Sequence, residues 1–262
     1  MFGIKKKAKK VGLAFGGGGA RGLAHLGVIR AFQEAGIKVD LVAGCSAGSI
    51  AAAAYCSGMS YDRMYATAKG LKKEDFFTSK LFFVPSDSKR IEETMKKVLG
   101  ENGDFEKCEI PLTVLAVDIV LGQEYVFENK GSIPRAVSAS CAVPGVLSPV
   151  VEHGRILMDG GVMNTVPASV LRDRGCDVVI SVAVGDLSTP VAKSSGLIDV
   201  ISASVKIMVR SNSVKGKNAS DIVIEPDLHG AKFNSLENVD SMIDAGYRAA
   251  MVKMPMIKEL VR

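Results

Sequence analysis

The first 56 residues constrain the fold most, because a glycine-rich loop and a glycine-flanked serine each follow a short apolar run. Residues 11–16, "VGLAFG", indicate a buried strand, and "ARGLAHLGVIRAFQEAG" after the glycines has helical spacing that ends at Gly36. "KVDLVAG" predicts a second buried strand, and Ser49–Tyr55 a helix packed through alanines. Such a strand–helix–strand unit predicts parallel pairing with a right-handed crossover.

The remainder of the chain continues this alternation of apolar runs and helical segments. We expect paired strands over 111–120 and 123–129, a hairpin over 148–161 that turns at His153 and Gly154, and buried strands over 177–184 and 221–226. A helix that runs into a turn is predicted over 132–145. Further helices are predicted over about 166–174, 197–215 and 239–260, the last interrupted at Pro255. The predicted fold class is α/β, a three-layer α/β/α sandwich around a mainly parallel sheet, with a crevice at the carboxyl ends of the strands.

One domain accounts for nearly the whole chain, because 262 residues bury a sizeable core without disulfides. We expect residues 1–10 to form a basic leader and residues 11–262 the domain. Between 69 and 109 the composition shifts toward lysine, and four of the ten phenylalanines fall between Phe76 and Phe83. This stretch predicts a small helical cap, whose phenylalanines either pack in the core or form a greasy, basic rim toward a lipid surface.

The cysteines and histidines point away from a disulfide framework and from a metal site. The five cysteines are odd in number and lie mostly among alanine, valine and serine, which indicates buried thiols in a reducing compartment. No cysteine pair has the spacing of zinc ligands, and the three histidines are far apart, so we expect no metal and no cofactor. We expect no nucleic-acid partner either.

The amino-terminal residues lack the features of a secretory signal, because no apolar segment with a small-residue cleavage site follows the basic cluster. A cytoplasmic protein is therefore predicted. Residues 41–61 are uncharged and long enough to cross a bilayer, but three glycines and four serines favour a buried strand, turn and helix. The five lysines between Lys5 and Lys10 form either a solvated leader or a peripheral contact with the anionic inner face of a membrane.

Ser46 is a candidate nucleophile, because Gly44-Cys45-Ser46-Ala47-Gly48 follows a predicted strand and precedes a predicted helix. In a nucleophile elbow the flanking glycines permit the sharp turn that lifts the serine hydroxyl above the sheet edge. The helix that follows also points its unpaired N–H groups at the site, which favours a developing negative charge. The pentapeptide occurs by chance too, so a purely structural turn remains an alternative on this stretch alone.

The glycine loop at residues 16–22 can expose several backbone N–H groups together, as an anion cradle. Two chemistries use such a cradle, the oxyanion of an acyl-transfer reaction and the pyrophosphate of a dinucleotide. Gly17-x-Gly19-x-x-Gly22 fits the dinucleotide fingerprint, which keeps an oxidoreductase as an alternative. In that fingerprint an acidic residue at the end of the second strand binds the ribose, whereas here Asp40 lies before the second strand. Acyl transfer accounts for both the loop and the elbow.

A serine nucleophile needs a base, and the chain offers two kinds of candidate. His25 lies within the first helix and His153 at a hairpin turn, but His229 follows a late strand and would suit an α/β-hydrolase-type esterase that pairs it with Ser46. Asp159 ends the apolar run "RILMD" and is followed by two glycines. An exposed aspartate is a feeble base, so this role requires burial to raise its pKa. An ordinary Asp-Gly turn is the alternative.

Taken in order, these motifs resemble the patatin-like phospholipases, a family with single-domain bacterial members that use a serine–aspartate dyad. The resemblance spans nearly the whole chain. It rests on the loop Gly17–Gly22, the elbow Gly44–Gly48 and the motif Asp159-Gly160-Gly161. The block from 138 to 150 is also similar, although Leu147 and Ser148 stand where an aromatic residue and a proline are usual, which bears on the shape of the acyl pocket.

The resemblance implies a role for each matching residue. Ser46 is the implied nucleophile, Asp159 the base, and the amides of Gly17, Gly18 and Gly19 the oxyanion hole, with no metal. The implied reaction is hydrolysis of a fatty acyl ester, from phospholipid or lysophospholipid, through an acyl-serine intermediate. A catalytically idle member that acts as a regulatory binding protein is a further alternative.

Arg21 lies in the first turn of the predicted helix, where the helix dipole disfavours a cation, so another interaction is expected to hold it. It either braces the glycine loop or binds a substrate phosphate.

Overall fold

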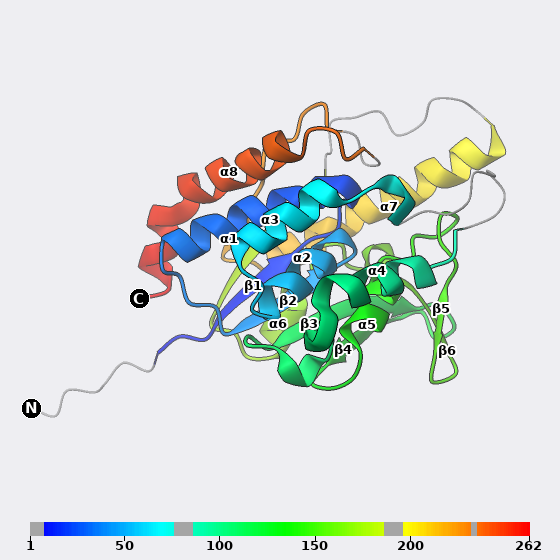
Figure 1. Ribbon diagram of the computed structural model, residues 1–262, viewed down its shortest axis with the longest axis horizontal. Helices are drawn as coiled ribbons and strands as arrows, with labels where there is room; N and C mark the ends of the chain where they lie inside the picture. The colour runs from blue at the N-terminus through cyan, green and yellow to red at the C-terminus, as the bar shows by residue number, and fades with distance from the viewer. Residues whose placement is uncertain (1–7, 76–85, 186–195, 232–234) are drawn as a thin grey trace, which may run out of the picture.

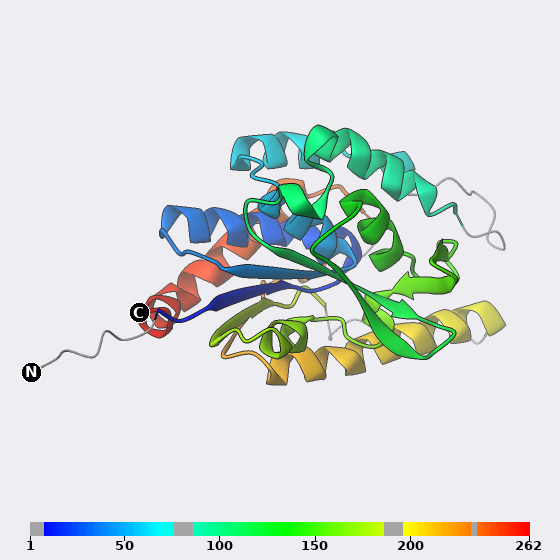
Figure 2. The ribbon, with the colours of Figure 1, turned by 90° about the horizontal axis from the view of Figure 1, so that it is seen from below.

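A computed structural model describes residues 8–75, 86–185, 196–231 and 235–262. Helices cover both faces of one central sheet (Figures 1 and 2). This arrangement confirms the predicted α/β class and the three-layer sandwich.

The described strands form one eight-stranded sheet in the order β5-β6-β3-β2-β1-β7-β8, with β4 paired to β3. Their bounds are β1 Val11–Phe15, β2 Leu41–Cys45, β3 Leu112–Asp118, β4 Gln123–Glu128, β5 Val150–Glu152, β6 Arg155–Asp159, β7 Val178–Val182 and β8 Ile222–Ile224. The neighbours β3, β2, β1, β7 and β8 pair in parallel, whereas β4, β5 and β6 join by antiparallel pairing. The sheet therefore has a parallel centre and an antiparallel flank.

The helices divide unequally between the two faces. Their bounds are α1 Ala24–Glu34, α2 Ala47–Cys56, α3 Tyr61–Gly70, α4 Lys89–Leu99, α5 Ile133–Ser140, α6 Ala168–Asp173, α7 Leu197–Asn218 and α8 Val239–Leu260. Short 3₁₀ turns are η1 Gly19–Leu23, η2 Lys73–Asp75, η3 Gly100–Asn102, η4 Phe105–Lys107 and η5 Gly160–Val162. In Figure 2, α6 and α7 lie on one side of the sheet, whereas α1, α2 and α5 lie on the other, with α3 and α4 outermost.

Strand alternation explains this division, because successive side chains of a strand point to opposite faces. Leu13 and Phe15 of β1 enter the large core that α1, α2, α5 and α8 share, whereas Ala14 enters a smaller core with Leu171 of α6. Both cores are continuous with residues of the neighbouring strands, so the sheet is buried on both faces.

The predicted interruption of the last helix at Pro255 is wrong, because α8 runs unbroken from Val239 to Leu260. Proline removes one helical hydrogen bond, to the carbonyl four residues earlier. Here that carbonyl belongs to Met251, on an exposed stretch of the helix, where water can satisfy it. The helix therefore continues through the proline.

The stretch predicted as a cap, 69–109, is described in part. Its helix α4 packs against α5 and buries Ile91, Met95 and Leu99. Residues 76–85, which include the phenylalanines from Phe76 to Phe83, lie outside the described residues. The described part is thus a packed outer layer of helices above α2 and α5.

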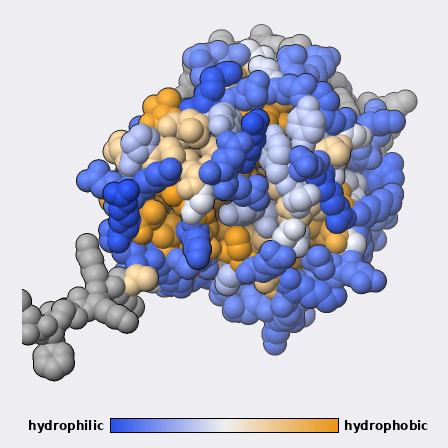
Figure 3. Space-filling view, turned by 60° about the vertical axis from the view of Figure 1, so that its left-hand side comes forward, coloured by the Kyte–Doolittle hydropathy of each residue, from blue (hydrophilic) through white to orange (hydrophobic). Residues whose placement is uncertain are grey.

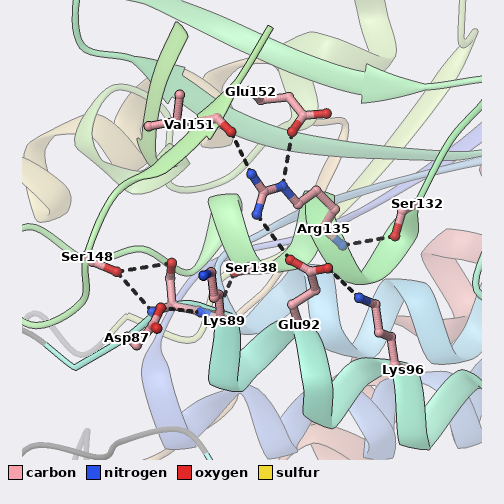
Figure 4. Close-up of polar contacts among 11 residues, drawn as sticks. Asp87, Lys89, Glu92, Lys96, Ser132, Arg135, Ser138, Ser148, Val151 and Glu152 are labelled. Carbon is pink, nitrogen blue, oxygen red and sulfur yellow. Dashed lines mark hydrogen bonds and ion pairs between the residues drawn. The ribbon is translucent and has the colours of Figure 1, made fainter. Parts of the chain in front are cut away.

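Polar contacts hold α4 to α5 and to the β5–β6 hairpin (Figure 4). Arg135 of α5 donates to Glu92 of α4 at 3.2 Å and to Glu152 of β5 at 3.0 Å. Burial raises the pKa of Glu92, but hydrogen bonds from Lys96 and Arg135 outweigh it, so the net shift is downward. The Ser138 hydroxyl also donates to the carbonyl of Ser88 at 2.7 Å. These contacts fix α4 in register with α5.

Residues 41–61 form β2 and α2, as expected, and no helix within the described ranges is long and apolar enough to cross a membrane. All five cysteines are free, and four of them are buried. The burial expected for most of the cysteines is therefore confirmed.

Candidate active site

Ser46 occupies a strained turn between β2 and α2. Its φ of 51° and ψ of −129° lie in a region that residues with a side chain rarely adopt. The flanking glycines permit the turn, since a Cβ at Gly44 would lie 2.6 Å from the Cα of Ser49, and one at Gly48 would collide with the carbonyl of Phe15. Strain held in place by tight packing is common at functional sites. The local structure is the sharp elbow that the pentapeptide predicts.

Asp159 reaches Ser46 through the pairing of strands far apart in sequence. Along one edge, β3 pairs first with β2, ending at Cys45 opposite Leu115, and then with β6, whose Asp159 lies opposite Ala116. The other edge of β3 is occupied by β4 throughout residues 113–118, so β2 and β6 share a single edge. Because β6 runs antiparallel to β3, its last residue meets the last residue of β2. The elbow and the carboxylate therefore converge.

The carboxyl group of Asp159 is only 5% exposed and accepts a hydrogen bond from the Gly161 N–H at 2.7 Å. Burial raises its pKa to about 6, although hydrogen bonds from the Ser46 side chain and the Gly161 backbone oppose the shift. A carboxylate with this pKa is mostly ionised at neutral pH, yet far more basic than an exposed aspartate. Asp159 thus has the burial that a base would require.

The glycine loop lies directly against the elbow, because a Cβ at Gly17 would be 3.0 Å from that of Ser46. The N–H of Gly17 is already donated to the carbonyl of Thr165 at 2.9 Å. Within the described ranges the N–H groups of Gly18 and Gly19 have no hydrogen-bond partner. Of the three amides predicted from the sequence, these two remain available to an anion.

Two further residues fix this geometry, and the sequence did not single them out. The hydroxyl of Ser140 accepts the Ser46 N–H at 2.8 Å and donates to the carbonyl of Leu115 at 2.6 Å, which ties the elbow to β3 and α5. Thr165 anchors the glycine loop through Gly17. The one sequence feature that could have indicated a role for Ser140 was its place in the block from 138 to 150, which is similar to the patatin-like family.

The remaining motif residues brace the site. Arg21 is 9% exposed and donates from Nε to the carbonyl of Ala231 at 3.0 Å, which links η1 to the segment after β8. A Cβ at Gly22 would lie 2.7 Å from that of Ala47, so η1 packs on the first turn of α2. A Cβ at Gly160 would lie 2.6 Å from the carbonyl of Leu115, so this glycine lets β6 end close to β3.

The structure places the three histidines in settings that differ from a catalytic imidazole. His25 is fully buried and donates from Nε2 to Gly16 at 2.8 Å, and burial lowers its pKa to about 4. The side chains of His153 and His229 are 81% and 77% exposed, beside Glu152 and Asp227 respectively. A triad needs a base that is oriented against the nucleophile by a third group, and Ser46 is itself buried.

Asp40 lies at the far end of β1 from the glycine loop. Its carboxylate accepts the N–H of Val11, the first residue of β1, at 2.7 Å. The loop follows Phe15 at the other end of this strand, about 13 Å away at the usual rise per residue. The acid is therefore badly placed to bind the ribose of a dinucleotide held by the loop.

An apolar cavity of about 180 Å³ opens beside Ser46 and Gly19. Alanines on one face of α2, Ala47, Ala51 and Ala54, form its floor, and the methionines and aliphatic side chains of α3 and α4 cover it. No cluster of histidine, cysteine and carboxylate side chains in the described ranges could hold a metal ion. The site thus combines a strained serine, a basic carboxylate, unpaired amides and an apolar space.

Comparison with known proteins gives one consistent family. A family model for patatin-like phospholipases matches residues 13–172. An uncharacterized NTE family protein of Mycobacterium tuberculosis is 31% identical, with 78% of this chain and 57% of that protein covered. The neuropathy target esterase sws of Drosophila melanogaster is 32% identical over 67% of this chain and 13% of its own length. The chain spans about half the length of the mycobacterial relatives it matches.

Among solved structures, VipD from Legionella pneumophila shares the fold, with a TM-score of 0.63 at 14% sequence identity. The match covers 96% of this chain and 67% of VipD.

Proposed function

The chain belongs to the patatin-like phospholipase family, and from this premise we propose that it hydrolyses fatty acyl esters of lipids with Ser46 and Asp159 as a catalytic dyad. The observation that carries the proposal is that β2 and β6 end side by side on one edge of β3, where Cys45, the residue before Ser46, lies opposite Leu115 and Asp159 lies opposite Ala116. The name of the Drosophila relative, an esterase, supports the same chemistry.

In the first half of the reaction, the Ser46 oxygen attacks the ester carbonyl while its proton passes to the Asp159 carboxylate. The negative charge that develops on the carbonyl oxygen is stabilised by the N–H groups of Gly18 and Gly19, whose positions do not have to change. When the carbon–oxygen bond breaks, the proton on Asp159 passes to the departing alcohol. The product is an acyl-serine and an ionised Asp159.

In the second half, Asp159 takes a proton from a water molecule, which attacks the acyl-serine. The same amides stabilise the second oxyanion, and the proton returns to Ser46 as the fatty acid leaves. A base works best when its pKa is near the working pH, and a value of about 6 suits this role far better than that of an exposed aspartate.

The cavity indicates which part of the substrate is recognised. Its walls are alanines, methionines and aliphatic side chains, so it suits the acyl chain and not the head group. Along α2 from Ala47 to Ala54 the floor is about 10 Å long at the rise of an α-helix. We propose that the acyl chain lies along this face of α2 and that a phospholipid or lysophospholipid supplies it.

The proposal is tested by Ser46→Ala, measured on a soluble p-nitrophenyl ester and on a phospholipid. Hydrolysis of both is expected to fall to background, with the circular dichroism spectrum unchanged. Ser57→Ala is the matched control, because Ser57 is a buried serine at the other end of α2 whose hydroxyl donates to the Ala54 carbonyl. Full activity in purified Ser46→Ala protein would refute the nucleophile assignment.

A further inference from the structure

Large apolar side chains are exposed in the segment after β3, in the segment after α5 and in β5. Five of them are Ile119, Val120, Leu121, Val146 and Val151, with exposed fractions of 43 to 62%. We propose that these five residues, the apolar rim, insert into a lipid surface and set the site directly on it. The proposal rests on the proposed lipid substrate and names the surface through which the enzyme meets it.

The rim gathers residues from three segments at the carboxyl end of the sheet. Ile119, Val120 and Leu121 form the turn after β3, and Ile119 begins about 10 Å beyond Ala116 at the rise of a strand. The N–H of Ile119 donates to the carbonyl of Ile156 at 3.0 Å. This hydrogen bond joins the turn to the β5–β6 hairpin, which carries Val151. In Figure 1 this hairpin projects at the right-hand end of the molecule.

Val146 connects the rim to the interior. Its side chain lines the apolar cavity beside Ser46, yet it is 43% exposed. Val146 thus offers an apolar contact to an acyl chain that passes from a lipid surface into the cavity. A second copy of the chain seated on the same residues would cover this entrance, which favours lipid as the occupant.

Charge around the rim is compatible with a lipid surface. Asp118, at the base of the turn, is buried and paired with Arg155 at 2.7 Å, and Glu152 of the hairpin is paired with Arg135 at 3.0 Å. Both carboxylates are thus neutralised by arginine, so neither opposes the approach of phosphate head groups.

Lys9 and Lys10, the lysines of the basic leader that the structure describes, lie away from the rim. Lys9 donates to the carbonyl of Leu260 at 2.6 Å and Lys10 to that of Arg174 at 2.9 Å, both at the amino end of β1. In Figure 1 the start of β1 and the end of α8 lie opposite the β5–β6 hairpin. A membrane bound through Lys9 and Lys10 would therefore face away from the entrance to the cavity.

The test is vesicle sedimentation with the Ser46→Ala protein, so that binding is measured whether or not the chain hydrolyses lipid. The probes are vesicles of phosphatidylcholine, with and without phosphatidylglycerol. The double substitution Val120→Ser and Leu121→Ser is expected to weaken binding to both about tenfold or more. It should leave the turn intact, because Asp118 holds it through the N–H groups of Val120 and Leu121.

The matched control replaces Val252 and Met256 of α8, which are 75% and 54% exposed at the opposite end. On the face shown in Figure 3, apolar residues are interrupted by hydrophilic ones. Val252→Ser with Met256→Ser is expected to leave vesicle binding unchanged. In an active background, the rim substitutions should spare turnover of a soluble short-chain ester.

Three results would overturn the rim. The first is equal vesicle binding by the rim variant and the control variant. The second is vesicle binding that requires phosphatidylglycerol and is unchanged by the rim substitutions. The third is self-association of a parent protein that binds no vesicles, if the rim substitutions abolish that self-association.

Discussion

Two walls of the site differ in what forms them. The wall that carries Ser46 and Asp159, the backbone wall, consists of closely packed main chain, whereas the opposite wall, the apolar wall of α3 and α4, consists of apolar side chains. On the first wall, added Cβ atoms at Gly44 and Gly160 would each lie 2.6 Å from a backbone atom, so small shifts displace the reacting groups. On the second, Met64 and Met95 border a cavity and can adjust. Substitutions in the first wall should therefore abolish catalysis, and substitutions in the second should change which length of acyl chain is hydrolysed.

The largest effect is expected from the carboxylate of the backbone wall. Asp159→Asn removes the proposed base and should lower kcat/KM on a soluble ester about 10² to 10⁴-fold. His229→Ala should stay within about twofold of the parent, because no step uses an imidazole. Both are measured on one ester after each variant is shown to be folded. A working Asp159→Asn enzyme beside an inactive His229→Ala enzyme would reverse the assignment.

The glycine loop offers a second way to break the backbone wall. A Cβ at Gly18 would lie 2.5 Å from Cγ2 of Val184, so Gly18→Ala must shift the loop and its N–H groups. Misplacing an oxyanion donor lowers the turnover number about 10² to 10³-fold. Adding Val184→Ala makes room for the new methyl group and should restore part of the loss. If Gly18→Ala alone kept full turnover, the loop would not hold the oxyanion.

The apolar wall should respond more mildly and more selectively. Ala54→Leu fills the far part of the cavity floor and should lower kcat/KM about tenfold for a long-chain ester, while a short-chain ester is nearly unaffected. The control is Ala66→Leu, on an exposed position of α3. Equal losses on both chain lengths would mean that the cavity does not hold the acyl chain.

The same contrast separates what the sequence predicts from what it does not. The loop, the first helix, the second strand and the elbow are contiguous, so their periodicity and glycines predicted them from local rules. The approach of Asp159 depends on the pairing of β6 with the edge of β3 beyond the point where β2 ends, and Asp159 lies more than a hundred positions after Ser46 in the sequence. The family's motif order indicated that approach, but no local pattern does.

Other features followed from neighbours that a single sequence does not specify. The hydrogen bond from the Gly17 N–H to the Thr165 carbonyl could not be predicted from the sequence. Thr165 follows the aspartate motif and contacts the glycine loop only in the folded protein. The interruption at Pro255 was a wrong prediction, because the exposure of Met251 depends on how α8 packs. The cavity likewise exists only where α3 and α4 cover α2.

The most direct test of the dyad is the rate at which a fluorophosphonate modifies the protein as a function of pH, with the modified residue mapped by mass spectrometry. The pKa of Asp159 is raised to about 6, so its basic form is depleted below that pH and complete well above it. We expect modification of Ser46 at a rate that rises with pH to a plateau, with an apparent pKa near 6. This profile should be lost in Asp159→Asn and unchanged in His229→Ala. Modification of another residue, or a profile that disappears with His229 and survives without the Asp159 carboxylate, would contradict it.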